Sequence, residues 1–583
     1  MCGIIGYIGK REANEILIKG LERLEYRGYD SAGVCISFNN QLQLNKVLGR
    51  VNNLKSSYLK GTKGIAHTRW ATHGRPSDLN AHPFIDEKLE FSVVHNGIIE
   101  NYLELKEGLQ VGGVKFSSET DSEVIVHLIS QAYSGNLREA VLKVVPKLQG
   151  AYALCVIKND SKEIIGARNG SPLVAGVGNQ ENFLASDVSA IIEHTKKVVY
   201  LNDFEVVEIK KDEVRVFNFN NKLKELKINE IYWDIEQSQK QGYKHFMLKE
   251  IYEQPKVIAV SLKVNVDNIL DNINNLKEIK RIIFVACGTA NYAGLVGKYL
   301  IEKIAKIPVI NETASEFRYK EPLISKDDLV IAISQSGETA DTLAAIRLAK
   351  QHGANTLGLI NVVDSTIARE VDQVIYTKAG QEIGVASTKA FMSQLILIYK
   401  LAHYLADEGF KSDRISSLIE KVLKLDDSIK QIAQRYYLNQ NFIYIGRNIN
   451  YPLALEGALK LKEISYIHAE AYPAGELKHG PIALVSEEMP TLAICPQDNV
   501  YQKTFSNIEE IKARSGKVIV IATEGDERVK KVANDVIYIP KVDDILYPLM
   551  ITIPLQLFAY HIADLKECDV DKPRNLAKSV TVE

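Results

Sequence analysis

Cysteine, histidine and tryptophan are scarce in this chain, whose 583 residues include 6, 12 and 2 of them. The cysteines form no CxxC pair and no zinc-ligand spacing, which argues against a disulfide framework and a zinc site. Scattered cysteines of this kind are typical of a reducing compartment. They lie at Cys2, Cys35, Cys155, Cys287, Cys495 and Cys568.

An excess of charge of either sign is also missing. The formal net charge is −2, so the composition gives no reason to expect a nucleic acid or an anionic membrane as a partner. Lys10, Arg11 and Glu12 interrupt the first residues, which therefore lack the apolar run of a secretory signal. We expect a cytoplasmic protein.

One stretch, residues 545–563, has no Asp, Glu, Lys or Arg and is long enough to cross a membrane. Pro548 and Pro554 break it, and Thr552 and His561 place polar groups within it. The pattern favours a buried helix with an irregular lead-in over a membrane span.

The chain is too long for one hydrophobic core, so its length predicts several domains. Up to about residue 215, short β-like runs mix with helical patterns at 14–24 and 122–133, which indicates an α+β domain with antiparallel sheets. A polar stretch, near 222–243, reads as a linker.

After Lys280 the sequence pattern changes to short apolar runs separated by helical stretches, which predicts a parallel, doubly wound sheet. The pattern recurs after about 160 residues, which indicates an internal duplication. The paired runs are 283–288 with 442–446, 330–334 with 492–495, and 356–360 with 518–522.

Cys2 is the first candidate for chemistry. If Met1 is removed, a terminal cysteine carries a thiol nucleophile and an α-amine base on one residue. The alternative is that Cys2 is a small apolar residue that begins a buried strand.

Each of the other candidate site residues in the first half of the chain also has a purely structural interpretation. Arg69 can hold a carboxylate or form a surface ion pair. Asn96 and Gly97 supply two donors for an oxyanion or form an Asn-Gly turn. Asp121 can accept a ligand's ammonium or cap a helix. Four histidines also occur in this half: His67, His73, His82 and His95. They lack acidic or sulfur partners at ligand spacing, which disfavours a metal site.

In the second half, 334–339 (SQSGET) follows an apolar strand and precedes a helix, which is typical of a phosphate cradle or of an ordinary N-cap turn. No GxxxxGK pattern is present, so a sugar phosphate is favoured over a nucleotide. Glu456, Lys460 and Glu463 share a helix face, as a salt-bridge ladder or as an acid/base cluster. A loop at 475–481 that bears His479 follows.

Several segments in this order resemble one family: Cys2-Gly3-Ile4, 24–33, 67–74, 95–97 and 119–121. They resemble the glutaminase domain of the N-terminal-nucleophile amidotransferases. With 334–339, 456–463, 475–481 and the tail 571–583, nearly the whole chain is similar to the glutamine–fructose-6-phosphate aminotransferases.

The resemblance implies a multidomain α/β fold, in which an N-terminal-nucleophile α+β glutaminase sandwich precedes two doubly wound SIS (sugar isomerase) subdomains. The expected limits are 2–220 for the glutaminase, 221–244 for the linker, 245–425 and 426–570 for the SIS subdomains, and 571–583 for a catalytic tail. A homodimer is implied, in which His479 reaches the neighbouring subunit's sugar site. No metal, nucleotide or flavin is implied.

The implied roles begin with Cys2, which would attack the glutamine side-chain amide while Asn96 and the Gly97 N–H hold the oxyanion. The residues that would bind or line the glutamine site are Arg69, Thr72, His73 and Asp121. We further expect Trp70 to gate a passage for ammonia.

At the sugar site the resemblance assigns a Schiff base to Lys578, ring opening to His479, and proton transfer between C1 and C2 to Glu463, with Lys460 in support. Fructose 6-phosphate would be bound by Thr289, Ser334, Gln335, Ser336, Thr339, Val385 and Ser387. Ala290 stands where the family often has serine, which puts one sugar or phosphate contact in doubt.

Three alternatives differ in function. Amidophosphoribosyltransferase shares the terminal cysteine, but its acidic phosphoribosyl-pyrophosphate motif is absent here. Asparagine synthetase needs a Ser-Gly-Gly loop, which is also absent. A non-catalytic SIS sensor of sugar phosphates would have no use for Cys2 or Lys578.

Overall fold

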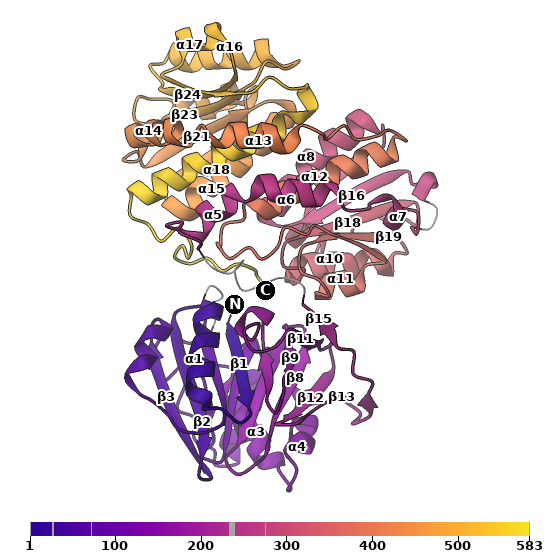
Figure 1. Cartoon of the computed structure of the whole chain (residues 1–583), viewed down its shortest axis with the longest axis vertical. Coiled ribbons are helices and arrows are strands. Elements are labelled where there is room, and N and C mark those ends of the chain that lie inside the picture. Colours follow the sequence, from indigo (N-terminus) through magenta and orange to yellow (C-terminus); the bar gives the residue numbers. More distant parts are fainter. Residues whose placement is uncertain (1, 26–27, 72, 232–239, 274–275, 582–583) are drawn as a thin grey trace. The chain divides into compact units, whose positions relative to one another are not determined.

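The computed structural model describes residues 2–25, 28–71, 73–231, 240–273 and 276–581 (Figure 1). The chain divides into two compact units. Unit 1 is Met1–Ser238 with Ala577–Glu583, and unit 2 is Gln239–Leu576.

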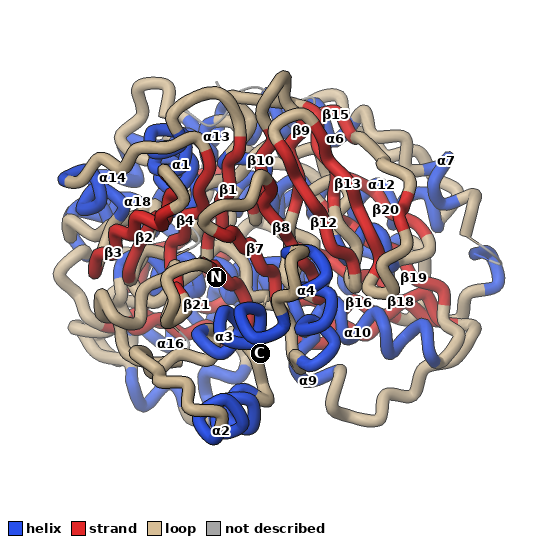
Figure 2. The backbone as a smooth tube through the Cα atoms, turned by 90° about the horizontal axis from the view of Figure 1, so that it is seen from below, coloured by secondary structure: helices blue, strands red, loops and turns tan. Residues whose placement is uncertain are grey.

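Unit 1 contains two antiparallel sheets. In the described residues, the β1 sheet has the strand order β15-β11-β9-β10-β1-β4-β2-β3, part of which Figure 2 shows side by side. Its strands are β1 (Gly3–Ile8), β2 (Ser31–Phe38), β3 (Gln41–Leu48), β4 (Lys63–Arg69), β9 (Val174–Val177), β10 (Asn182–Ala185), β11 (Lys197–Tyr200) and β15 (Asn229–Glu230).

The β6 sheet has the order β14-β13-β12-β8-β7-β6-β5. Its strands are β5 (Phe84–Ile85), β6 (Phe91–Gly97), β7 (Tyr152–Lys158), β8 (Glu163–Asn169), β12 (Glu205–Lys210), β13 (Glu213–Asn218) and β14 (Leu223–Lys224). The helices of unit 1 are α1 (Ala13–Leu24), α2 (Tyr102–Val111), α3 (Glu123–Ala132) and α4 (Leu137–Val144).

The alternation of side chains along the strands builds the layers of unit 1. Ile4 of β1 packs with Val94 of β6 in the core between the sheets. Its neighbour Ile5 points to the opposite face and packs with Leu17 and Leu21 of α1. Helices α3 and α4 cover the outer face of the β6 sheet in the same way. The predicted α+β sandwich is confirmed.

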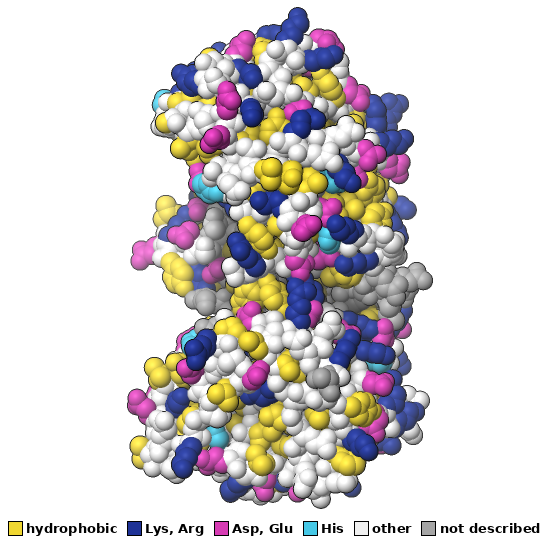
Figure 3. Space-filling model, turned by 90° about the vertical axis from the view of Figure 1, so that its left-hand side faces the viewer, with side chains coloured by type: hydrophobic (Ala, Val, Ile, Leu, Met, Phe, Trp, Pro, Cys, Tyr) yellow, Lys and Arg dark blue, Asp and Glu magenta, His cyan; other side chains and the backbone are white. Residues whose placement is uncertain are grey.

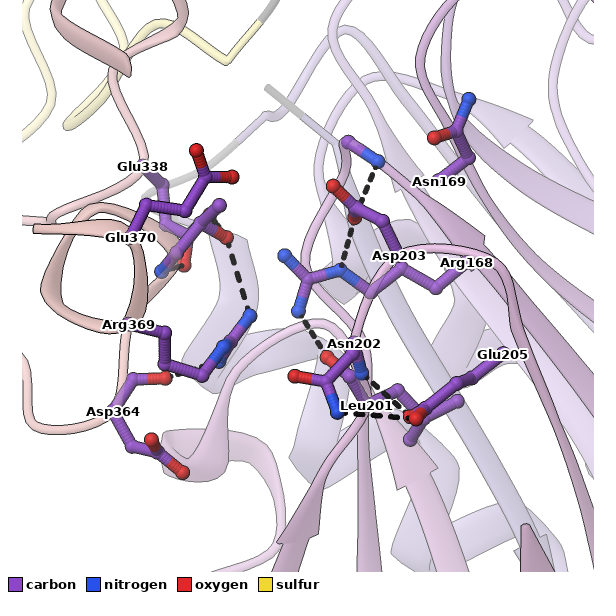
Figure 4. A network of polar contacts seen from close by, with 12 residues as sticks. Arg168, Asn169, Leu201, Asn202, Asp203, Glu205, Glu338, Asp364, Arg369 and Glu370 are labelled. Atoms are coloured by element: carbon purple, nitrogen blue, oxygen red, sulfur yellow. Dashed lines mark hydrogen bonds and ion pairs between the residues drawn. The ribbon is translucent and has the colours of Figure 1, made fainter. Parts of the chain in front are cut away.

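A buried arginine fixes the turn between β11 and β12. The Arg168 guanidinium donates to the Leu201 carbonyl and lies 3.3 Å from Asp203, as Figure 4 shows. Asn202 closes the turn by donating its N–H to Glu205 at 2.7 Å. In the predicted linker 221–244, β14 and β15 pair with β13 and β11, while residues 232–239 lie outside the described residues.

Unit 2 contains two parallel sheets with the same strand order, β17-β16-β18-β19-β20 and β22-β21-β23-β24-β25. The strands are β16 (Arg281–Ala286), β17 (Val309–Thr313), β18 (Asp328–Ser334), β19 (Asn355–Ile360), β20 (Gln373–Tyr376), β21 (Asn441–Gly446), β22 (His468–Pro473), β23 (Thr491–Cys495), β24 (Val518–Thr523) and β25 (Asp535–Ile539). The predicted doubly wound sheets and their duplication are confirmed.

Helices surround both sheets of unit 2. They are α5 (Phe246–Tyr252), α6 (Gln254–Leu262), α7 (Asp267–Leu270), α8 (Gly288–Ile304), α9 (Ala314–Phe317), α10 (Ala340–Gln351), α11 (Thr366–Glu370), α12 (Lys389–Leu405), α13 (Ile415–Leu423), α14 (Asp426–Tyr436), α15 (Tyr451–Ser465), α16 (Tyr501–Lys512), α17 (Glu527–Val532) and α18 (Tyr547–Leu565).

The long apolar run forms α18, preceded by a 3-10 turn at Asp544–Leu546. By length and composition the stretch Asp544–Leu565 could cross a membrane, but 89% of its apolar window is buried inside the protein. Its side chains share one core with residues of both parallel sheets, such as Phe284 and Phe442. The prediction of a buried helix with an irregular lead-in is confirmed.

Candidate active sites

Cys2 lies at the start of β1, a central strand of its sheet. Its half-buried thiol accepts a hydrogen bond from the Trp70 N–H at 3.2 Å. Burial raises the pKa of the Cys2 thiol, while the Trp70 N–H and the Arg69 charge lower it. The thiol therefore needs a base before it can act as a nucleophile.

Asn96 and Gly97 are paired residues of β6, opposite Ala153 and Tyr152. The Asn-Gly turn is therefore excluded. Gly97 has φ +122°, and a Cβ there would lie 1.9 Å from the Ala151 carbonyl oxygen, so a side chain is not accommodated. The Asn96 amide donates to the Cys2 carbonyl oxygen at 3.0 Å. One of the two expected donors, the Asn96 amide, thus lies beside Cys2, where an oxyanion hole would need it.

His67 orients this amide, a role that the sequence did not indicate. Its Nε2 lies 3.0 Å from both the Asn96 Oδ1 and the His95 carbonyl oxygen. Both are acceptors, so Nε2 carries the proton. Burial lowers the pKa of His67 to about 3, which keeps the ring neutral. Because Asn96 accepts from His67, its NH₂ group faces Cys2.

Arg69 ends β4 and is only 4% exposed. Its Nη2 donates to the carbonyls of His73 and Gly74, the latter at 3.0 Å. Its Nη1 has no hydrogen-bond partner among the described residues. A buried guanidinium nitrogen without a partner is suited to a ligand carboxylate, and the surface ion pair is excluded.

Asp121 does not cap α3, because the N-cap position is Ser122. Its Oδ2 accepts from the Ile99 N–H at 2.8 Å. Asp121 raises and Arg69 lowers the pKa of Cys2, so both charges act on the thiol. His73 is half-buried, and its Nδ1 has no partner within the described chain. Thr72 lies outside the described residues.

The candidate sugar site begins where the strand order of the β16 sheet reverses, between β16 and β18. Loops that follow the carboxyl ends of two such strands form a ligand crevice. After these strands come Thr289, in the first turn of α8, and the segment 334–339.

The 334–339 loop presents hydroxyl and N–H groups ahead of α10. Ser334 Oγ accepts from the Gly337 N–H at 2.9 Å and lies 3.4 Å from Thr339 Oγ1. Ser336 Oγ accepts from the Glu338 N–H at 3.2 Å. Gly337 has φ +65°, and a Cβ there would lie 1.9 Å from Ser365 Oγ. Such a loop at a helix N-terminus suits a phosphate.

Glu456, Lys460 and Glu463 lie on one face of α15. Lys460 Nζ is 2.6 Å from Glu463 and 3.5 Å from Glu456, and it donates to Thr289 Oγ1 at 2.9 Å. Lys460 is fully buried, so the exposed salt-bridge ladder is excluded. The carboxylates raise the pKa of Lys460, while burial raises that of Glu456 to about 7. Glu463 stays partly accessible to a substrate.

The loop before α12 depends on Glu382, which the sequence analysis missed. Its carboxylate accepts from Ser387 Oγ at 3.0 Å and from the Thr388 N–H at 2.9 Å. Val385 is held by a bond from its N–H to the Asp571 carbonyl at 3.0 Å. No local pattern marks Glu382, because its partners are neighbours in a loop rather than in a helix or strand.

His479 is exposed and ends the 3-10 turn Glu476–His479, after β22. Lys578 is half-buried and belongs to the terminal segment of unit 1. Ala290 lies in the first turn of α8. The roles assigned to His479 and Lys578 stay predictions.

Comparison with known proteins identifies both kinds of domain. The family model described as "Glutamine amidotransferase domain" matches residues 67–193, and the model described as "SIS domain" matches 275–404 and 437–564. Among solved structures, the C-terminal domain of the aminotransferase from Francisella tularensis is 43% identical with a TM-score of 0.53, covering 57% of this chain and 99% of that one.

Curated relatives match along their whole length. The glutamine–fructose-6-phosphate aminotransferase (isomerizing) of Aquifex aeolicus is 51% identical over 592 residues, and that of Chlorobaculum tepidum is 49% identical over 615. In each case the match covers 100% of both chains. The chain therefore belongs to the family of isomerising glutamine–fructose-6-phosphate aminotransferases.

Proposed function

We propose that the chain converts fructose 6-phosphate and glutamine to glucosamine 6-phosphate and glutamate. The observation that carries this proposal is the presence of two different catalytic arrangements in one chain. Cys2 has an oxyanion donor beside it, and a buried Glu–Lys–Glu cluster adjoins a hydroxyl-rich loop. The relatives with this name match the full length of the chain.

In the first half-reaction the α-amine of Cys2, freed by removal of Met1, takes the thiol proton. The thiolate attacks the amide carbon of glutamine, and Asn96 with the Gly97 N–H stabilises the oxyanion. Ammonia leaves, and water hydrolyses the thioester to glutamate. The side chains that hold the glutamine are Arg69, Thr72, His73 and Asp121. The unpartnered Nη1 of Arg69 supports this assignment.

In the second half-reaction Lys578 forms a Schiff base at C2 of the sugar after His479 assists ring opening. Ammonia replaces Lys578 at C2, and Glu463 then moves a proton from C1 to C2. The buried ammonium of Lys460 holds the Glu463 carboxylate in place through an ion pair of 2.6 Å. Phosphate and sugar are bound by Thr289, Ser334, Gln335, Ser336, Thr339, Val385 and Ser387.

The proposal includes the domain boundaries expected from the sequence. These are 2–220 for the glutaminase, 221–244 for the linker, 245–425 and 426–570 for the two SIS subdomains, and 571–583 for the tail. The protein is cytoplasmic and forms a homodimer in which His479 serves the neighbouring subunit's site. The exposure of His479 supports that role.

The test is to incubate the protein with glutamine and fructose 6-phosphate and to measure both products. We expect equal amounts of glucosamine 6-phosphate and glutamate, and an intact mass without Met1. Cys2→Ala is the matched control, which should produce neither product yet still bind fructose 6-phosphate. Glutamate without glucosamine 6-phosphate would indicate a different acceptor and contradict the proposal.

A further inference from the structure

Asp121 is held by two buried side chains that take no part in the mechanism proposed above. Its Oδ1 lies 3.2 Å from the Ser122 hydroxyl, and that hydroxyl lies 2.8 Å from Nδ1 of His95. The three residues, which we call the Asp121 network, are between 1% and 3% exposed. They come from two elements, because His95 belongs to β6 and Ser122 stands at the N-cap of α3.

The Ser122 hydroxyl does not do what serine usually does at this position. An N-cap serine normally accepts a hydrogen bond from a helix N–H two or three residues later. The Ser122 side chain makes no such bond. It is turned toward Asp121 and His95 instead, so capping of α3 does not explain its presence.

The direction of each hydrogen bond follows from the protons available. Burial lowers the pKa of His95, so the ring is neutral at pH 7 and carries one N–H. An ionised carboxylate only accepts, so Ser122 donates its one proton to Asp121 Oδ1. The hydroxyl therefore accepts from His95, which places the imidazole proton on Nδ1. The other ring nitrogen, Nε2, is buried without a hydrogen-bond partner in the described part of the chain.

The network fixes the Asp121 carboxylate and leaves it able to bind a ligand. Oδ1 accepts from Ser122, and Oδ2 accepts from the Ile99 N–H at 2.8 Å. A carboxylate offers about four lone-pair sites, so each oxygen can accept a second donor. An ammonium group carries three donors and the opposite charge. Both oxygens are thus oriented by the protein and remain suited to a ligand ammonium.

We propose that Ser122 and His95 are positioning residues for glutamine. The His95 Nδ1–H fixes the Ser122 hydroxyl, which holds the Asp121 carboxylate in the orientation that binds the substrate ammonium. This inference rests on the function proposed above, because it takes Asp121 as the partner of the glutamine amine. Since neighbouring residues of a strand point to opposite faces, β6 can serve the amine through His95 and the oxyanion through Asn96.

The test measures glutamine hydrolysis by the full-length protein without fructose 6-phosphate. Ser122→Ala should raise KM for glutamine by roughly tenfold, because a hydrogen bond to a charged group is lost. It should change kcat by less than about threefold, because the ammonium is bound alike in the ground state and the transition state. Ser122→Thr keeps the hydroxyl and should restore KM. Ser134→Ala, at an exposed serine just beyond α3, is the matched control and should change neither constant.

Glutaramate, which is glutamine without its α-amine, separates positioning from a general loss of structure. It is measured as a competitive inhibitor of glutamine hydrolysis. Its inhibition constant should be the same for the wild type and for Ser122→Ala, because it has no ammonium for Asp121 to bind. A distorted site would bind both ligands more weakly.

His95→Leu tests the other link of the network. It should raise KM for glutamine, and His95→Asn, whose amide nitrogen can take the place of Nδ1, should restore part of the loss. A wild type that releases no glutamate would contradict the proposed function itself. If the wild type hydrolyses glutamine, this inference alone is overturned by an unchanged KM in Ser122→Ala or His95→Leu, by no restoration in Ser122→Thr, or by equal weakening of glutamine and glutaramate.

Discussion

Asn96 contributes to an oxyanion hole only if its amide presents the NH₂ group to the reacting carbonyl. The oxygen and the NH₂ group of the amide differ in hydrogen bonding but hardly in shape, so a neighbouring group has to fix the orientation of the amide. Here His67 makes the choice through its Nε2–H, and burial keeps that ring neutral. At the scale of single residues, catalysis therefore depends on groups that do not touch the substrate.

Replacing His67 with leucine tests this positioning role. The amide of Asn96 would lose the donor that fixes it, so kcat for glutamine hydrolysis should fall by roughly tenfold or more, out of the 10²–10³ expected for losing a whole oxyanion donor. KM should change little, because the oxyanion forms only in the transition state. His67→Gln, which can still donate, should recover part of the rate. A raised KM with unchanged kcat would contradict the assignment.

Lys578→Arg tests the Schiff base. Arginine keeps the positive charge, but with a pKa above roughly 12 it does not act as an amine nucleophile. Synthesis of glucosamine 6-phosphate should stop while glutamine hydrolysis continues. Borohydride trapping with fructose 6-phosphate should label the C-terminal peptide of the wild type only. Label on Lys460 or Lys389 would show that the wrong lysine was assigned.

At the scale of elements, a buried carboxylate sets the shape of one of the loops proposed to contact the sugar. Glu382 accepts hydrogen bonds from Ser387 Oγ and from the N–H groups of Thr388 and Ala390, at the start of α12. Its charge also raises the pKa of Lys460. One side chain thus connects the substrate loop with the acid/base cluster on α15.

Glu382→Gln should loosen this loop, since a neutral amide accepts more weakly and its NH₂ end cannot accept at all. We expect KM for fructose 6-phosphate to rise by roughly tenfold, equivalent to about 1.4 kcal/mol. Glutamine hydrolysis should not change. Glu524→Gln, an exposed acid of unit 2, is the matched control. An unchanged KM in the Glu382 variant would show that the loop is held by other contacts.

At the scale of the whole molecule, the two proposed half-reactions draw on both units. Cys2 belongs to unit 1, as does the terminal segment that carries Lys578, whereas Lys460 and Glu463 belong to unit 2. On the face that Figure 3 shows, acidic and basic side chains are interspersed, in keeping with a net charge of −2. Ammonia is mostly protonated in neutral water, and ammonium is no nucleophile, so free diffusion would waste it.

Trp70 is the proposed gate for ammonia, because its N–H contacts Cys2 Sγ and its neighbour Arg69 is suited to the glutamine carboxylate. Trp70→Ala should leave glutamine hydrolysis within roughly tenfold, about 1.4 kcal/mol of barrier. The yield of glucosamine 6-phosphate per glutamate should fall clearly below one. Both products are measured in the same reaction. A ratio that stays at one would exclude Trp70 as the gate.

Unit 1 should lose stability on acidification, because burial lowers the pKa values of His67, His82 and His95. Below pH 6.5 the unfolded chain binds protons that the folded chain does not, so the free energy of unfolding falls as pH falls. For His67, with a pKa of about 3, the loss between pH 7 and pH 5 is about 2 kcal/mol.

Urea unfolding followed by tryptophan fluorescence measures this loss, since Trp70 lies in unit 1. His67→Leu should show a smaller difference between pH 7 and pH 5 than the wild type. Equal unfolding free energies of the wild type at the two pH values would contradict buried, neutral histidines.

The sequence by itself determined the order of elements and most of the candidate residues. Periodicity is a property of neighbouring residues, so the three central strands of each parallel sheet and the buried α18 could be predicted from short windows. The duplication was visible for the same reason, because each copy repeats a local pattern. Cys2, Arg69 and Ser334 could also be identified as candidates from the short sequence motifs that contain them.

Only the tertiary structure decided how these residues are used, because their partners are distant in the chain. Asn96 reaches Cys2 across 94 positions, and Lys460 reaches Thr289 across 171. Asn96-Gly97 reads locally as a turn, but the pairing of β6 with β7 makes it a strand. Glu382 has no local signal at all. A hydrogen bond depends on atoms being close in space, and folding alone brings such distant residues together.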